Sequence, residues 1–120
     1  MALTKVDYNM TKNITGGLLV TTTVVATNAA SLPFSGTNAR SQYLLTPASP
    51  QDFTALTKQI GDGTTAGQEL YLIGTSDANY VVFNSSGTNM ILNGDWVGGA
   101  NMILSLIWDG TKWQETGRNK

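Results

Sequence analysis

The sequence predicts an all-β fold, an antiparallel sandwich or barrel of jelly-roll-like form that is built from short hairpins. The first observation is the stretch 69–116, in which short apolar runs are interrupted at near-regular intervals by GTSDAN, NSSG, NG, GGAN and DG. Each interruption marks a turn, because Gly tolerates positive φ and Asn and Asp bond their own backbone. The second observation is the run LLVTTTVVAT at 18–27, whose β-branched side chains suit a pleated surface. Together these patterns are typical of a ladder of antiparallel hairpins.

The chain of 120 residues is expected to form one domain, preceded by an arm. We assign residues 1–17 to an extended N-terminal arm that ends in two glycines, and residues 18–120 to a single β domain. A frayed terminus is the alternative interpretation of the arm. The arm has more apolar side chains than a solubilising tail needs, and we expect these to contact a partner: Leu3, Val6, Tyr8 and Met10.

The expected strands follow the apolar runs along the chain. They are 18–27, 42–46, 69–74, 80–84, 89–92, 94–97, 102–108 and 112–116. A loop at 28–41 separates the first two, because Pro33 breaks the pattern there. The Gly-rich segment 61–68 is interpreted as a hairpin or crossover turn, since its glycine spacing misses the phosphate-binding pattern and a strand follows it.

The segment 49–60 is open to two interpretations. Ser49 followed by Pro50 and Asp52 resembles a capped helix start, and Phe53, Leu56 and Ile60 fall at helical spacing. Against this, Phe53, Ala55 and Thr57 alternate as they would in a strand. Local chemistry favours one or two helical turns at 50–59, and the family resemblance described below favours a strand.

The run MILSLIW at 102–108 is apolar on both faces if it is a strand. Leu104, Leu106 and Trp108 share one face, while Ile103 and Ile107 lie on the other. Such a strand either lies between two layers or carries a subunit interface. We therefore take Ile103 and Ile107 as candidate oligomer-interface residues.

The three tryptophans are divided between the core and a possible interface. If Asp109 and Gly110 form a two-residue turn, Leu106 faces Trp113 and Trp108 faces Thr111. That pairing puts Trp108 and Trp113 in one buried cluster with Leu104 and Leu106. Trp96 follows Asp95 on a short strand, and we expect it to be an exposed or interfacial aromatic.

Composition excludes most catalytic machinery. The chain has no His and no Cys, which rules out hydrolytic triads, His-based zinc sites and thiolate sites. Asp62, Asp77, Asp95 and Asp109 each sit beside turn residues, so we interpret them as turn formers rather than paired catalytic acids. We expect no enzyme activity, no cofactor and no metal.

Charge and hydropathy also exclude two classes of partner. The net charge is −1, and the seven Lys and Arg residues are scattered, which argues against nucleic acid. No apolar run approaches the roughly 18 residues that would span a bilayer, and the first ten residues lack a secretory apolar segment. We therefore expect neither a nucleic-acid partner nor a membrane.

The last 50 or so residues resemble a module that recurs in virion proteins of tailed bacteriophages. The matching runs are GQELYLIGTSD at 67–77, LNGD at 92–95 and LSLIWDGTKW at 104–113. The module is found in capsid decoration (cement) proteins and in segments of tail fibres. The resemblance implies an all-β, homotrimeric virion structural protein without a catalytic role.

Two functions follow from that resemblance as expectations. In the first, the protein is made in the bacterial host cytoplasm and decorates the capsid surface of the virion. There it would bind the major capsid protein and stabilise the shell, with residues 1–17 lying along the shell. In the second, it is a receptor- or glycan-binding module of a tail fibre, an interpretation that its Asn and Trp content also suits.

Overall fold

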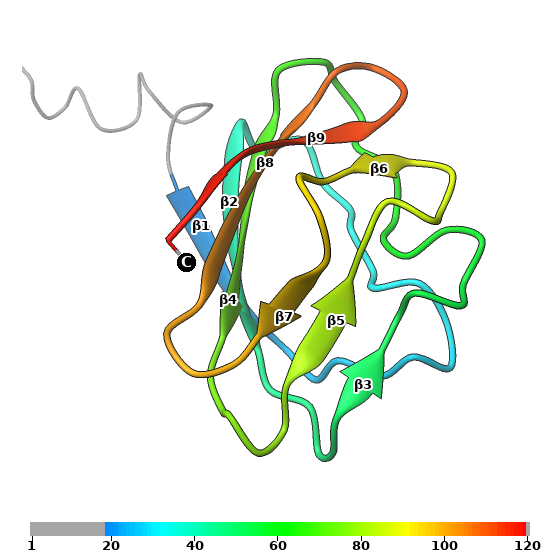
Figure 1. Cartoon of the computed structure of the whole chain (residues 1–120). Coiled ribbons are helices and arrows are strands. Elements are labelled where there is room, and N and C mark those ends of the chain that lie inside the picture. The colour runs from blue at the N-terminus through cyan, green and yellow to red at the C-terminus, as the bar shows by residue number, and fades with distance from the viewer. Residues whose placement is uncertain (1–18, 120) are drawn as a thin grey trace, which may run out of the picture.

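The computed structural model describes residues 19–119, which form two β-sheets packed face to face (Figure 1). The larger sheet has the spatial order β1-β2-β4-β8-β9-β6, with strands β1 (Leu19–Val24), β2 (Arg40–Leu45), β4 (Glu69–Gly74), β8 (Ile103–Trp108), β9 (Trp113–Arg118) and β6 (Met90–Ile91). The smaller sheet has the order β3-β5-β7, with strands β3 (Gln51–Asp52), β5 (Val81–Phe83) and β7 (Trp96–Gly98). The predicted all-β sandwich is confirmed.

The pairing of strands differs from the expected ladder of antiparallel hairpins. Among the described strands, β8 and β9 alone form a hairpin of consecutive strands. β1 runs parallel to β2, β2 to β4, β3 to β5 and β6 to β9. Parallel neighbours need long crossovers, and the segments 25–39 and 46–68 supply them. Turn chemistry marks where the chain bends, but it does not state which strands meet afterwards.

The hydrophobic core lies between the inner face of the larger sheet and the layer opposite it. Leu70 and Leu72 of β4 and Leu104 and Leu106 of β8 are buried on that inner face. From the opposite layer come fully buried side chains of the smaller sheet and of the crossover loops: Leu32, Phe53, Ile60, Phe83 and Trp96. The loops therefore complete a layer that three short strands could not make alone.

Aromatic rings fix the packing of this core. Phe53 stacks on Phe83 with ring centroids 4.6 Å apart. Phe34, from the first crossover, meets the Trp113 ring edge-on at 5.0 Å. The Trp113 indole N–H donates to the carbonyl of Gly61 at 2.9 Å, which satisfies its polar group on burial. Strand β9 is thus tied to both crossover loops.

The segment 49–60 contains no helix, so the helical interpretation is wrong. It begins with the two-residue strand β3 and continues in turns. Carbonyls that a helix would use internally serve other segments: the amide of Thr88 donates to the carbonyl of Thr57, and that of Leu32 donates to the carbonyl of Gln59. The apolar positions that suggested a helix face are still directed inward, because they serve the core from an irregular loop.

The turn between β8 and β9 has four residues rather than the expected two. Trp108 pairs with Trp113, and the segment 109–112 closes the hairpin. The Asp109 carboxylate accepts hydrogen bonds from the amides of Thr111 and Lys112, both at 2.8 Å. The expected Trp108–Trp113 cluster nevertheless forms, with ring centroids 5.2 Å apart.

Candidate functional site

The described residues hold no group of three or more His, Cys, Asp or Glu side chains that could bind a metal ion. Several of their carboxylates hold turns and loops in place through hydrogen bonds. Asp77 accepts the amide of Ala100 at 2.9 Å, and Asp62 bonds Lys58 at 3.1 Å and Asn89 at 2.9 Å. These bonds lower the pKa of Asp62, with the Asn89 amide as the largest cause. Donors in fixed positions keep the Asp62 carboxylate charged, and the carboxylate in turn holds the segments of Lys58 and Asn89 together.

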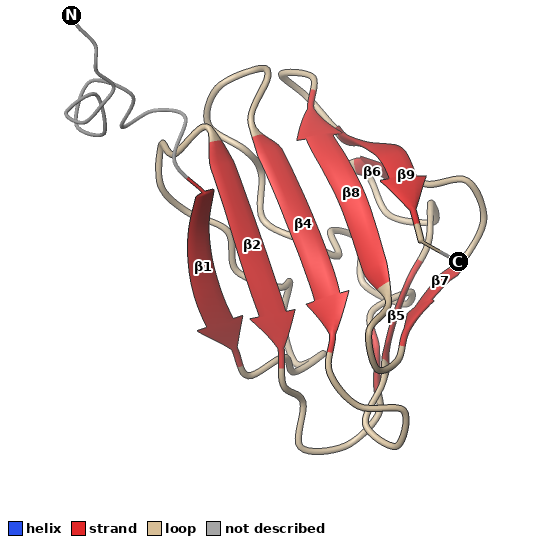
Figure 2. Cartoon of the chain, turned by 90° about the vertical axis from the view of Figure 1, so that its left-hand side faces the viewer, coloured by secondary structure: helices blue, strands red, loops and turns tan. Residues whose placement is uncertain are grey.

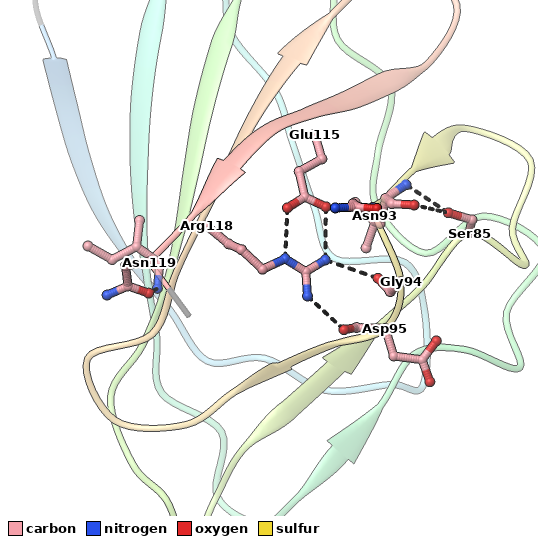
Figure 3. Close-up of polar contacts among 9 residues, drawn as sticks. Ser85, Asn93, Gly94, Asp95, Glu115, Arg118 and Asn119 are labelled. Carbon is pink, nitrogen blue, oxygen red and sulfur yellow. Dashed lines mark hydrogen bonds and ion pairs between the residues drawn. The ribbon is translucent and has the colours of Figure 1, made fainter.

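A charged polar cluster joins the end of β9 to the loop 93–95 (Figure 3). We call it the clasp: Glu115, Arg118 and the backbone of residues 93–95. Arg118 Nε donates to Glu115 Oε2 at 2.7 Å, and its other nitrogens donate to the carbonyls of Asp95 and Gly94 at 2.8 and 3.0 Å. Glu115 Oε1 accepts the amide of Asn93 at 2.6 Å.

A β-bulge explains why the two charged side chains of the clasp lie on one face. Residues three apart on a regular strand point to opposite faces. In β9, Glu115 pairs with Leu106 and Gly117 pairs with Ser105, so Thr116 is the extra residue of a bulge. The bulge returns Arg118 to the side of Glu115, whose side chain is only 7% exposed.

The clasp is a structural joint rather than a reaction site. Each carboxylate oxygen of Glu115 accepts from a donor within the chain, and the Arg118 guanidinium donates to four oxygens, the two of Glu115 and the carbonyls of Gly94 and Asp95. The Arg118 bond lowers the pKa of Glu115 and raises that of Arg118, so both remain charged. The arrangement fastens the loop between β6 and β7 to the larger sheet.

The remaining candidate is the outer face of the larger sheet, which Figure 2 shows head-on. Outward positions on β1, β2, β4 and β8 fall in rows given by the register, and we call this surface the open face. Its side chains are Leu19, Thr21, Thr23, Arg40, Gln42, Leu44, Glu69, Tyr71, Ile73, Ile103, Ser105 and Ile107. No segment within residues 19–119 crosses in front of it (Figure 2).

The open face is hollowed across β1, β2, β4 and β8. A shallow depression of about 320 Å³ is lined by one charged side chain, Arg40, and otherwise by apolar and uncharged polar ones, namely Leu19, Gln42, Tyr71, Ile73, Ile103 and Ser105. The Tyr71 hydroxyl donates to Glu69 at 2.8 Å, and Glu69 lies 3.6 Å from Arg40. The open face therefore offers apolar contact with one pair of opposite charges near its edge.

The structure places the predicted site residues in three different settings: on the open face, in the core, and outside the described residues. Ile103 and Ile107 are half-buried on the open face, two rows apart, with Ser105 in the row between them. Trp96 was expected to be exposed or interfacial, and this is wrong: it is 1% exposed and packs beside Phe83, 6.3 Å between ring centroids. The arm residues Leu3, Val6, Tyr8 and Met10 lie outside the described residues.

Sequence reasoning missed the centre of the open face. Tyr71 and Ile73 alternate with the buried Leu70 and Leu72, so the run at 69–74 is apolar on both faces, as at 102–108. That pattern was a usable signal. The contribution of Gln42 and Leu19 could not be found locally, since it depends on the parallel pairing of β1, β2 and β4.

Comparison with models of protein families, with curated proteins and with solved structures gave no match to this chain. In the part of the chain that the structure describes, no helix could cross a membrane.

Proposed function

We propose that this protein is a structural component of a tailed-phage virion, a homotrimeric capsid decoration protein that binds the assembled shell and stabilises it. The observation that carries the proposal is the open face. It is a sheet face of largely apolar and uncharged side chains that no other described segment covers. A surface of this kind serves association rather than chemistry.

The sequence resemblance supplies the kind of assembly. The runs at 67–77 and 104–113, on which it rests, form β4, β8 and the hairpin turn. They therefore build the two central strands of the larger sheet, β4 and β8, both of which contribute side chains to the open face. The resemblance and the open face thus involve the same two strands, which supports the proposal of a virion role.

Stabilisation of the shell follows from mass action. A partner that binds the assembled shell and not its free subunits lowers the free energy of the assembled state. Three linked copies raise the effective concentration of the second and third contacts, so a modest affinity at each contact suffices. The major capsid protein is the partner, and residues 1–17 would supply contacts along the shell.

Binding of the purified protein to undecorated capsids tests this role. We expect saturable binding to capsids built from the major capsid protein of the same phage, and a higher temperature of capsid disruption once the protein is bound. Deleting residues 1–17 should weaken that binding and leave the oligomer intact. Binding to host cells without binding to capsids would favour the tail-fibre alternative.

A further inference from the structure

We propose that Asn93 is a site of spontaneous covalent modification, in which it loses its side-chain amide through a cyclic succinimide and the product weakens the clasp. The only co-reactant is water. The inference does not depend on the proposed virion role, because it concerns a chemical change within the folded chain. The observations that carry it are the sequence of the loop, the hydrogen bonds that its reacting atoms lack, and the bonds of the clasp on either side.

Asn93 is the only asparagine of the chain that is followed by glycine. The backbone nitrogen of the residue after an asparagine can attack the asparagine's side-chain amide carbon, and a Cβ on that residue hinders the approach. Gly94 has no Cβ, and its φ of 88° is one that glycine adopts without strain. Both residues are exposed, so water reaches the reacting atoms. The loop thus presents the least hindered pair of this kind in the chain.

The reacting atoms have no hydrogen-bond partner within residues 19–119. This holds for the Asn93 side-chain amide, the Asn93 carbonyl and the Gly94 amide, while the atoms on either side are anchored (Figure 3). The Asn93 amide donates to Glu115, and the Gly94 carbonyl accepts from Arg118. Rotation about ψ of Asn93 and φ of Gly94 turns the peptide plane between these anchors. The approach of the Gly94 nitrogen to the side chain therefore needs no bond of the clasp to break.

The reaction balances with water alone. The Gly94 nitrogen forms a bond to Cγ of Asn93 and gives up its proton, the bond from Cγ to the side-chain nitrogen breaks, and ammonia leaves. Water then adds to one of the two ring carbonyls and breaks its bond to the Gly94 nitrogen, which regains a proton. Opening at Cγ leaves aspartate, and opening at the backbone carbonyl leaves isoaspartate. No oxidation or reduction takes place.

Both products alter the clasp. The Asn93 amide lies 2.6 Å from Glu115 Oε1, so a new carboxylate on residue 93 adds negative charge beside the carboxylate of Glu115. Isoaspartate also adds one carbon to the backbone between the Asn93 amide and the Gly94 carbonyl. These are the atoms that Glu115 and Arg118 hold, at 2.6 and 3.0 Å. The lengthened segment shifts one anchor relative to the other and weakens the attachment of the loop to β9.

Other positions that could form the same ring are held by hydrogen bonds. Asp62 and Asp109 also precede glycines, but their hydrogen bonds lower the pKa of both carboxyls and keep them ionised. An ionised carboxylate lacks a leaving group for the attack. The side-chain oxygen of Asn84 accepts from Gln59 at 3.0 Å and from the Ser86 amide at 2.9 Å, which fixes that side chain. We therefore expect Asn93 to react first.

Incubation of the folded protein at mildly alkaline pH tests the inference. Peptide mapping by mass spectrometry should find the first conversion of an amide to an acid at Asn93, with aspartate and isoaspartate as products. Asn93→Gln is the matched control, because it keeps an exposed amide whose attack would close a larger ring, and its conversion should be at least tenfold slower. Ion exchange separates the modified fraction, which carries one more negative charge. That fraction should unfold at a lower urea concentration than the unmodified one.

Three outcomes would overturn the proposal. The same mapping of the chain unfolded in urea gives the rate without the fold, and an Asn93 that reacts there but stays intact in the folded protein is protected by the clasp. Earlier conversion of another asparagine in the folded protein would move the site. A modified fraction with the urea midpoint of the unmodified protein would separate the reaction from the clasp. None of these results bears on capsid binding, so the proposed function is tested independently.

Discussion

The two faces of the larger sheet are built by the same strands, but one face is buried in the core and the other is left uncovered by the described residues. On β8, Leu104, Leu106 and Trp108 point inward and are buried, while Ile103 and Ile107 point outward and are half-buried. On β4, Leu70 and Leu72 alternate in the same way with Tyr71 and Ile73. On these two strands the outward face also carries large apolar side chains, although Glu69 and Ser105 interrupt them. The difference lies in what covers them, which is a property of the crossover loops and the smaller sheet.

This contrast separates stability from association. Burial of apolar area against a packed layer contributes to folding, and a side chain removed there leaves a cavity. An uncovered apolar face contributes little until a partner arrives. Substitutions at two neighbouring positions of the same strand therefore test the two roles separately, because one side chain faces the core and the other faces outward.

The largest expected effect comes from neighbouring residues on β8. Leu104→Ala should lower the free energy of unfolding by about 2–5 kcal/mol, since Leu104 is fully buried between the layers. Ile103→Ala should cost about 1 kcal/mol or less in dilute solution, because its side chain faces outward. Urea denaturation of both variants at one protein concentration measures the difference. Equal costs would mean that the open face is covered in the folded protein.

Two glycines on opposite faces sharpen the same contrast. A Cβ at Gly74 would lie 2.1 Å from the carbonyl oxygen of Gly99, where β4 meets the opposite layer. A Cβ at Gly117, which pairs with Ser105 of the open face, would meet nothing within 4 Å. Gly74→Ala should destabilise by about 1–3 kcal/mol or more, because the obstacle is backbone. Gly117→Ala should change the unfolding free energy by less than about 1 kcal/mol in thermal or urea denaturation. A tolerated alanine at Gly74 would show that the two layers can separate there.

Much of this fold could be predicted because its strands alternate. The segment expected at 69–74 matches β4, and the run 102–108 contains β8 with both faces assigned correctly. The boundaries of the shorter strands shifted, since β6 and β7 have two and three residues and little pattern to read. The parallel pairing was not predicted, because it joins segments that are distant in sequence.

The misassigned residues share a physical cause, which is contact between distant segments. Phe53 and Ile60 are buried as a helix face would be, yet loop-to-loop backbone bonds replace the helix. Trp96 follows an exposed Asp95 on a short strand, and the position of β7 over the larger sheet buries it. The assignment of Ile103 and Ile107 to an interface rests on alternation and stays a prediction, whereas the hollow that Ile103 lines could be found only from the register of four strands.

The clasp gives a smaller effect that depends on pH. Arg118 and the Asn93 amide lower the pKa of Glu115 in the folded protein, so the unfolded chain binds this proton more readily. Its contribution is therefore present above the unfolded pKa of about 4.3 and is lost as the pH falls through the folded value. Glu115→Gln should cost about 1–3 kcal/mol at pH 7 and less at pH 3.

Urea denaturation from pH 7 to pH 3 checks this prediction. The pKa values of Asp52, Asp62 and Asp109 are also lowered in the folded protein, so both proteins should lose stability on acidification. The unmodified chain should lose more, because it also loses the contribution of Glu115. Thr116→Ser is a suitable control, since Thr116 is exposed at the bulge and keeps its backbone geometry. If the stability of Glu115→Gln and of the unmodified protein changes with pH in parallel, Glu115 does not contribute to the pH dependence of stability.

The smallest expected effect concerns the charge pair of the open face, and it returns to the contrast between folding and association. Arg40 Nε lies 3.6 Å from Glu69 Oε1 with both side chains exposed, whereas the two atoms of the clasp pair are 2.7 Å apart and largely buried. Arg40→Gln should therefore change the free energy of unfolding by less than about 1 kcal/mol, and salt should screen that change. Its effect on association should be larger than its effect on folding, because desolvation against a partner strengthens the attraction between opposite charges. Equilibrium sedimentation and urea denaturation of the same variant measure both quantities. If Arg40→Gln lowers the free energy of unfolding and leaves association unchanged, Arg40 contributes to folding and not to association.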